Sequence, residues 1–163
     1  MASALEDRML KHPFFEDFVG DTEKIVSKIV SFTGEAEYHD GELLIEESGE
    51  ADSFFLLEDG VVSVELEGGD GKTMEIQSLF APGTLGWSWL IPPHRWKFDA
   101  RANGSVEAIR IDGRQLRNLC QDNPALGNRF HKRMAMILSK RLTGTRMSLL
   151  AETHPDFEPN YSY

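Results

Sequence analysis

Between residues 33 and 111, short apolar runs alternate with turn residues, and this pattern constrains the fold more than any other feature of the chain. The runs are separated by glycine-containing turns, among them Asp40-Gly41 and Asp59-Gly60. Short strands at about 8–12-residue spacing, each bounded by turn signals, are typical of sandwiches, jelly rolls and small barrels. We therefore expect a β-roll whose strands include residues 43–45, 54–57, 61–66, 74–79, 98–102 and 106–111.

One of these runs indicates the kind of strand. Val62, Val64 and Leu66 alternate with Ser63 and Glu65. Because successive side chains of a strand point to opposite faces, this run predicts one buried and one wet face. Such a strand is typical of an antiparallel sheet.

Helical spacing precedes the roll. Leu5 and Met9 repeat at helical intervals, His12-Pro13 interrupts them, and apolar residues resume after Asp21, which we expect to be an N-cap. The fold class is therefore predicted as α+β, an antiparallel β-roll or jelly roll of cupin-like shape flanked by helices. We divide the chain into an N-terminal helical segment (1–32), a β-roll ligand-binding core (33–111), C-terminal helices for hinge and dimerisation (112–151) and a flexible tail (152–163).

After Asp112 the spacing is helical again. A short helix should end at Asn123-Pro124, and a second should run from about residue 125 to about residue 150, with proline suiting its first turn. At 1.5 Å per residue, the second helix is roughly 38 Å long, more than a small β-domain can cover. We therefore expect part of its apolar stripe to meet a second copy in a homodimer. The stripe consists of Leu126, Phe130, Met134, Ile137 or Leu138, Leu142 and Leu149.

Charge narrows the classes of partner. The formal net charge is −10, with 5 basic and 20 acidic residues in 1–80 and 12 basic and 7 acidic residues in 81–163. This balance argues against non-specific nucleic-acid binding and against docking on anionic lipid. An anionic ligand is expected in the second half of the chain.

Targeting and redox signals are sparse. The N-terminus lacks the basic start and apolar run of a signal peptide, and no stretch reaches the roughly 18 apolar residues of a membrane helix. We expect a soluble, cytoplasmic protein.

The single cysteine, Cys120, excludes an internal disulfide and a thiolate zinc site, and its position on an apolar helix side indicates inert packing.

Enzymatic motifs are missing from the sequence. The five histidines are isolated, no His-x-His occurs, and neither a Gly-x-Ser-x-Gly elbow nor a phosphate loop is found. We predict no catalytic activity, no metal and no required cofactor. A metal-dependent cupin-like enzyme is the weakest of the alternatives, and metal analysis of the purified protein would test it.

The order of elements and the glycine spacing from Pro13 to Leu150 resemble the cyclic nucleotide-binding domain family, which includes CAP/FNR-like effector domains and protein kinase A regulatory subunits. DNA-binding relatives carry a helix-turn-helix domain after the long helix. Only thirteen residues follow Leu150 here, so we expect no direct DNA binding. The resemblance rests on His12-Pro13-Phe14-Phe15, on residues 40–45, 49–57 and 58–62, and on Pro82-Gly83-Thr84-Leu85-Gly86.

The ligand cassette departs from the family pattern. Where relatives carry a glutamate for the ribose hydroxyl, this chain has Trp87, and the position of the phosphate arginine falls on Trp96, with Arg95 one residue early. An indole donates one hydrogen bond and accepts none, but it can stack on a base. The resemblance implies a ligand site formed by Leu85, Gly86, Trp87, Ser88, Trp89, Arg95 and Trp96, with Arg141 and Thr145 added from the long helix.

Two further readings stay open beside the enzyme. The first is a non-enzymatic regulatory module that senses cAMP, cGMP or a related small anion and signals through its C-terminal helices. The second is a degenerate domain that binds no nucleotide and serves as a dimeric adaptor for a protein partner. Each tryptophan, and the basic face of the long helix, has a purely structural interpretation as well.

Overall fold

The computed structural model describes residues 3–158. The chain begins with α1 (Ala4–Lys11), which starts behind a capping box in which Ser3 and Glu6 bond reciprocally. A 3-10 turn η1 (Pro13–Phe15), α2 (Thr22–Ile29) and η2 (Val30–Phe32) follow. Asp21 is the N-cap residue of α2, but its side chain makes no capping bond; it forms ion pairs with Lys24 and Arg129 instead.

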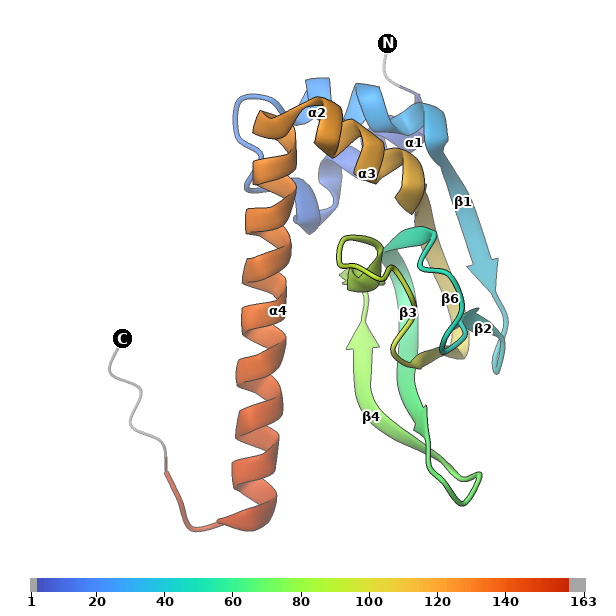
Figure 1. The fold of residues 1–163 in the computed structure, drawn as a ribbon, viewed down its shortest axis with the longest axis vertical. Helices are drawn as coiled ribbons and strands as arrows, with labels where there is room; N and C mark the ends of the chain where they lie inside the picture. Colours follow the sequence, from blue (N-terminus) through green and yellow to red (C-terminus); the bar gives the residue numbers. More distant parts are fainter. Residues whose placement is uncertain (1–2, 159–163) are drawn as a thin grey trace.

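The β-roll is one antiparallel sheet with the strand order β1-β6-β3-β4, with β2 paired to β6 and β5 paired to β3. The α+β class and the antiparallel roll predicted from the sequence are confirmed. In Figure 1 the short helices gather at one end of the roll, and the long C-terminal helix runs alongside it. The strands are β1 (Thr33–Tyr38), β2 (Leu43–Ile45), β3 (Ser53–Glu67), β4 (Thr73–Phe80), β5 (Gly83–Leu85) and β6 (Asp99–Asp112).

Two of the expected turns are wrong. Residues 54–57 and 61–66 belong to the single strand β3, and residues 99–102 and 106–111 belong to the single strand β6. The pairing register between these strands shifts between Leu57 and Val61. Gly60, at φ +94°, lies so close to β6 that an added Cβ would stand 2.3 Å from the Ser105 carbonyl oxygen. Gly60 therefore permits a bulge in β3 where it pairs with β6, and the chain does not reverse there.

Two strands were absent from the sequence prediction. β1 pairs with β6 along its whole length, and the three-residue β5 pairs with β3. The β1 sequence Thr-Gly-Glu-Ala-Glu-Tyr has no buried residue, so it lacks the apolar alternation that identifies strands.

Two hydrophobic clusters meet across β3. Phe54 and Leu56 belong to a cluster on the side of the helices, which we call the helix-side cluster; it also contains Met9, Phe14, Ile25, Trp89, Leu116 and Phe130. Phe55 and Leu57 belong to a cluster inside the roll, which we call the roll cluster; it also contains Ile45, Val62, Leu85, Trp96 and Phe98. Both faces of this part of β3 are therefore buried, which explains why its sequence is continuously apolar. The helix-side cluster joins the roll to α1, η1, α2 and the C-terminal helices.

The C-terminal helices are α3 (Gly113–Asp122), capped by Asp112, and α4 (Pro124–Thr153), capped by Asn123. Leu126, Phe130 and Met134 of α4 are buried, whereas Leu142 and Leu149 of the same predicted stripe are 51% and 60% exposed. Only the first half of α4 is therefore anchored in the helix-side cluster. Among residues 3–158, no helix combines the length and apolar character needed to span a membrane.

Candidate functional site

Gly86 turns the chain from β5 into the predicted ligand cassette. It has φ +102°, and the short 3-10 helix η3 (Trp87–Trp89) follows it directly. An added Cβ would lie 2.9 Å from the Ser53 carbonyl oxygen and 3.0 Å from the ring of Trp96. Both the left-handed backbone and the crowding require glycine here.

Trp89 is separated from the roll interior. Its side chain is fully buried in the helix-side cluster, with ring centroids 5.7 Å from Phe54 and 6.2 Å from Phe130 of α4. Trp89 therefore anchors η3 against the long helix. The predicted ligand residue is a core residue in this structure.

Trp96 occupies the roll interior. It is 5% exposed, belongs to the roll cluster together with Leu85, and its ring edge lies against Gly86. Trp87 is half-buried, touches both clusters, and has its ring centroid 6.4 Å from that of Phe98. Aromatic rings of the chain itself therefore line the space between the cassette and the roll.

Arg95 points away from this interior. Its backbone neighbours pair with the segment before β3: Trp96 N–H donates to the Gly49 carbonyl at 2.9 Å, and Ala51 N–H donates to the His94 carbonyl at 2.8 Å. Since side chains alternate along an extended segment, Arg95 and Trp96 face opposite sides. The Arg95 guanidinium is exposed and donates to the Ser48 carbonyl at 3.3 Å.

Two polar atoms of the cassette are buried without partners. Among residues 3–158, Ser88 Oγ and Trp89 Nε1 find no hydrogen-bond partner. Ser88 is 1% exposed. A buried unpaired polar group costs about 1–3 kcal/mol, so η3 is not fully satisfied in this conformation.

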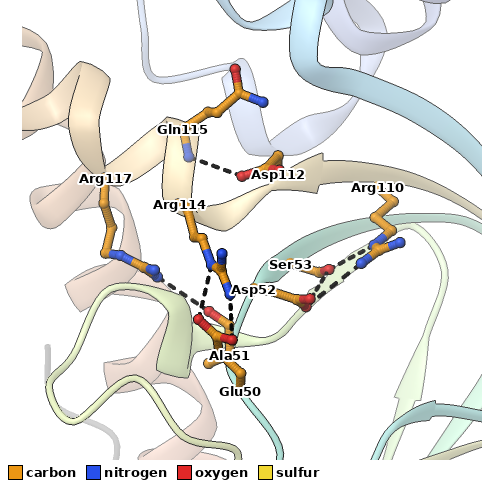
Figure 2. A network of polar contacts seen from close by, with 9 residues as sticks. All are labelled: Glu50, Ala51, Asp52, Ser53, Arg110, Asp112, Arg114, Gln115 and Arg117. Atoms are coloured by element: carbon orange, nitrogen blue, oxygen red, sulfur yellow. Dashed lines mark hydrogen bonds and ion pairs between the residues drawn. The ribbon is translucent and has the colours of Figure 1, made fainter.

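Sequence reasoning missed Arg117, which couples the cassette to the hinge. Its Nη1 donates to the Trp89 carbonyl at 2.6 Å and to the Ala51 carbonyl at 3.1 Å. Figure 2 shows Arg114 and Arg117 reaching from α3 to the segment that precedes β3. No motif distinguished Arg117 from the neighbouring arginines, because its partners come from distant segments.

Arg114 and Arg110 complete this polar network. Arg114 Nε donates to Glu50 Oε1 at 2.8 Å and its second nitrogen pairs with the other oxygen, which lowers the pKa of Glu50. Arg110 donates to Ser53 Oγ at 2.6 Å and lies 3.6 Å from Asp52. β6, α3 and the start of β3 are therefore tied together (Figure 2).

Arg141 and Thr145, the two ligand-site residues predicted on α4, differ in whether they contact the roll. Arg141 is half-buried and donates to the carbonyl of Thr84 and, at 3.3 Å, to its hydroxyl; burial lowers the pKa of Arg141. Thr145 is exposed, and its hydroxyl donates back to the Arg141 carbonyl at 3.0 Å. Arg141 thus links α4 to β5 beside Gly86, whereas Thr145 does not reach the roll.

Comparison with known proteins agrees with this architecture. Residues 35–123 match the cyclic nucleotide-binding domain family, which is more than half of the chain. The chain belongs to this family, whose domain is generally a regulatory, non-enzymatic module with cyclic nucleotides as effectors. No curated protein matches the chain.

Solved structures include close structural neighbours. A putative cyclic nucleotide-binding protein from Geobacter metallireducens GS-15 is 25% identical, with a TM-score of 0.75 over 87% of this chain and 99% of that chain. A cyclic nucleotide-binding domain from Methylobacillus flagellatus KT is 16% identical, with a TM-score of 0.74 over 97% and 87%. The regulatory domain of Toxoplasma gondii PKA with cAMP is 15% identical, with a TM-score of 0.63 over 86% and 49%.

Proposed function

We propose that this chain is a non-enzymatic regulatory module that signals to a protein partner through α3 and α4, with its roll closed to cAMP and cGMP by its own tryptophans. The observation that carries this proposal is the place of Trp96, buried in the roll cluster against Gly86. A nucleotide beneath η3 would have to displace that ring.

The cost of displacing Trp96 supports the proposal. A buried aromatic side chain covers roughly 150–250 Å², which at about 25 cal/mol per Å² corresponds to about 4–6 kcal/mol. Each 1.4 kcal/mol is a tenfold change in affinity, so nucleotide binding would be weakened by roughly three to four orders of magnitude.

The chemistry of the cassette supports it as well. Trp87 offers no acceptor to ribose hydroxyls, because an indole only donates. Arg95 faces away from Trp96 and bonds to the Ser48 carbonyl. Trp87 and Arg95 therefore do not supply the two polar contacts, one to the ribose and one to the phosphate, by which relatives hold the nucleotide.

The route of output follows the contacts of the helices. Arg117 joins α3 to η3, and Arg141 joins α4 to β5. A partner that shifts α4 would therefore pull on the roll, in a two-state movement of a hinge. Homodimerisation through the exposed half of α4 is part of this proposal, supported by exposed Leu142 and Leu149. Cytoplasmic location and the lack of DNA binding stay predictions from the sequence.

Intrinsic tryptophan fluorescence tests the proposal. The protein is titrated with cAMP and with cGMP up to millimolar concentration, because a nucleotide under η3 would contact the cluster that holds Trp87 and Trp96. We expect no saturable change. A saturable change in the micromolar range that is lost in Trp87→Ala would overturn the closed-roll proposal.

That second outcome would establish a nucleotide sensor that replaces polar contacts by stacking. The unpaired Ser88 Oγ and Trp89 Nε1 are the observation that favours this candidate, because a ligand-induced shift of η3 could give them partners. Arg95→Ala distinguishes a sensor that holds the nucleotide by stacking alone from one that also clamps its phosphate. The substitution weakens nucleotide binding only if the Arg95 guanidinium holds the phosphate.

A further inference from the structure

A basic cavity lies outside the roll, between α4 and the loop that joins η1 to α2. It has a volume of about 440 Å³. Since it is formed by the anchored half of α4, a ligand there would bridge the N-terminal segment and the long helix. Its lining residues are Asp17, Phe18, Asn128, Arg129, Lys132, Arg133 and Met136.

Cations outnumber carboxylates in this cavity. Arg129, Lys132 and Arg133 stand on neighbouring turns of α4. Asp17 pairs with Arg133, and Asp21 pairs with Arg129 at 3.1 Å. Each arginine is thus partly neutralised, and Lys132 has no ion-pair partner among residues 3–158.

Each arginine retains a buried donor with nothing to bond. Among the residues that the structure describes, Arg129 Nη1 and Arg133 Nε have no hydrogen-bond acceptor. Leaving a buried charged donor unpaired is costly, and most buried donors in folded proteins are paired. Both nitrogens lie beneath the accessible surface, so they strengthen the positive potential of the cavity wall, and a ligand would bond to the accessible guanidinium nitrogens beside them.

The Arg133 fork is held in place before any ligand arrives. The Arg133 side chain is 15% exposed, donates to the Pro13 carbonyl at 2.7 Å, and lies with its guanidinium carbon 5.9 Å from the centre of the Phe14 ring. Phe18 and Met136 add an apolar part to the cavity. A site with fixed donors loses little entropy when it binds.

We propose that this cavity binds a small phosphate monoester with an apolar body. A phosphate presents three oxygens, which can accept from Arg129 and Arg133 and interact with Lys132 at the same time. The apolar body would lie on Phe18 and Met136. The cavity shares no residue with the roll interior, so this site is independent of the proposed function.

Isothermal titration calorimetry with phenyl phosphate tests the site, at constant ionic strength because exposed charges are screened by salt. Inorganic phosphate and benzoate are the comparison ligands. Lys132→Ala and Arg129→Ala are compared with Lys140→Ala, which removes the same charge as Lys132→Ala from the same helix outside the cavity. Circular dichroism confirms that each variant is folded.

We expect saturable binding of phenyl phosphate that is about tenfold weaker in Lys132→Ala and in Arg129→Ala and unchanged in Lys140→Ala. Inorganic phosphate and benzoate should each bind more weakly than phenyl phosphate. No saturable heat, equal weakening in Lys140→Ala, or benzoate binding as tightly as phenyl phosphate would overturn the proposal. Nucleotide titrations of the roll report on the proposed function separately.

Discussion

His12 connects the first helix to the roll through both of its ring nitrogens. Nδ1 accepts from the Phe14 N–H at 3.2 Å, and Nε2 lies 3.0 Å from the Leu57 carbonyl oxygen. Only the neutral tautomer with its proton on Nε2 satisfies both bonds. Burial lowers the pKa of His12 below its ordinary value of 6.5.

The stability of the protein should therefore fall as the pH drops below about 6.5. The unfolded chain takes up a proton at His12 more readily than the native chain, so acid favours unfolding until the pH passes the native pKa. Burial and Arg117 lower the pKa of His94 in the same direction. Urea unfolding between pH 7 and pH 5 should show a smaller loss of stability in His12→Gln than in wild type.

The single variant His94→Gln serves as the comparison for that measurement. His94 lies in the segment that pairs with Ala51. The pH dependence of the His94→Gln variant measures how much of the acid sensitivity comes from this second histidine. Equal pH slopes in wild type and His12→Gln would contradict the role assigned to His12.

At the scale of elements, the junction between β5 and η3 depends on Gly86. Gly86→Ala would combine a positive φ with an overlap on the Ser53 carbonyl, whereas Gly104→Ala at φ +80° meets no atom within 4 Å. Both variants should be destabilised by about 1–2 kcal/mol of backbone strain, and Gly86→Ala by more. Urea unfolding of the two variants measures the difference; equal losses would show that the crowding relaxes.

The link between η3 and α3 is the second prediction at this scale. Arg117→Ala removes donors from two carbonyls and should lower stability by about 1.5–3 kcal/mol. Arg114→Ala breaks an exposed ion pair with Glu50 and should lower stability much less than Arg117→Ala does. Hydrogen exchange of the Trp89 and Leu90 amides should speed up in Arg117→Ala only. Equal exchange in both variants would contradict the proposed link between η3 and α3 through Arg117.

At the scale of the whole molecule, we predict that the second half of α4 mediates association. Leu142 is 51% exposed and lies beyond the anchored part of the helix. If α4 pairs with a second copy, sedimentation equilibrium should give a dimer for wild type and a monomer for Leu142→Glu, because a carboxylate would be buried at the contact. Val19→Glu, at an exposed loop residue before α2, is the control and should remain dimeric. A monomeric wild type would refute the proposed dimer.

Periodicity and glycine spacing were enough to predict the roll, the short and long C-terminal helices and the family, because each of these patterns is local in the chain. The capping of α4 by Asn123-Pro124 and the buried position of Cys120, whose pKa is raised to about 11, were also accessible from local sequence. The same local signals misplaced the turns at Gly60 and Gly104, since both glycines have the positive φ typical of turns and yet lie inside the continuous strands β3 and β6.

The candidate site was decided by tertiary structure. Trp89 and Trp96 are the same residue type only a few positions apart, yet one packs against α4 and the other fills the roll. Arg117 bonds to carbonyls 28 and 66 residues away along the chain. The sequence by itself determined which elements form, because periodicity acts over one or two turns. Which side chains meet depends on how those elements cross, and only the packed structure contains that information.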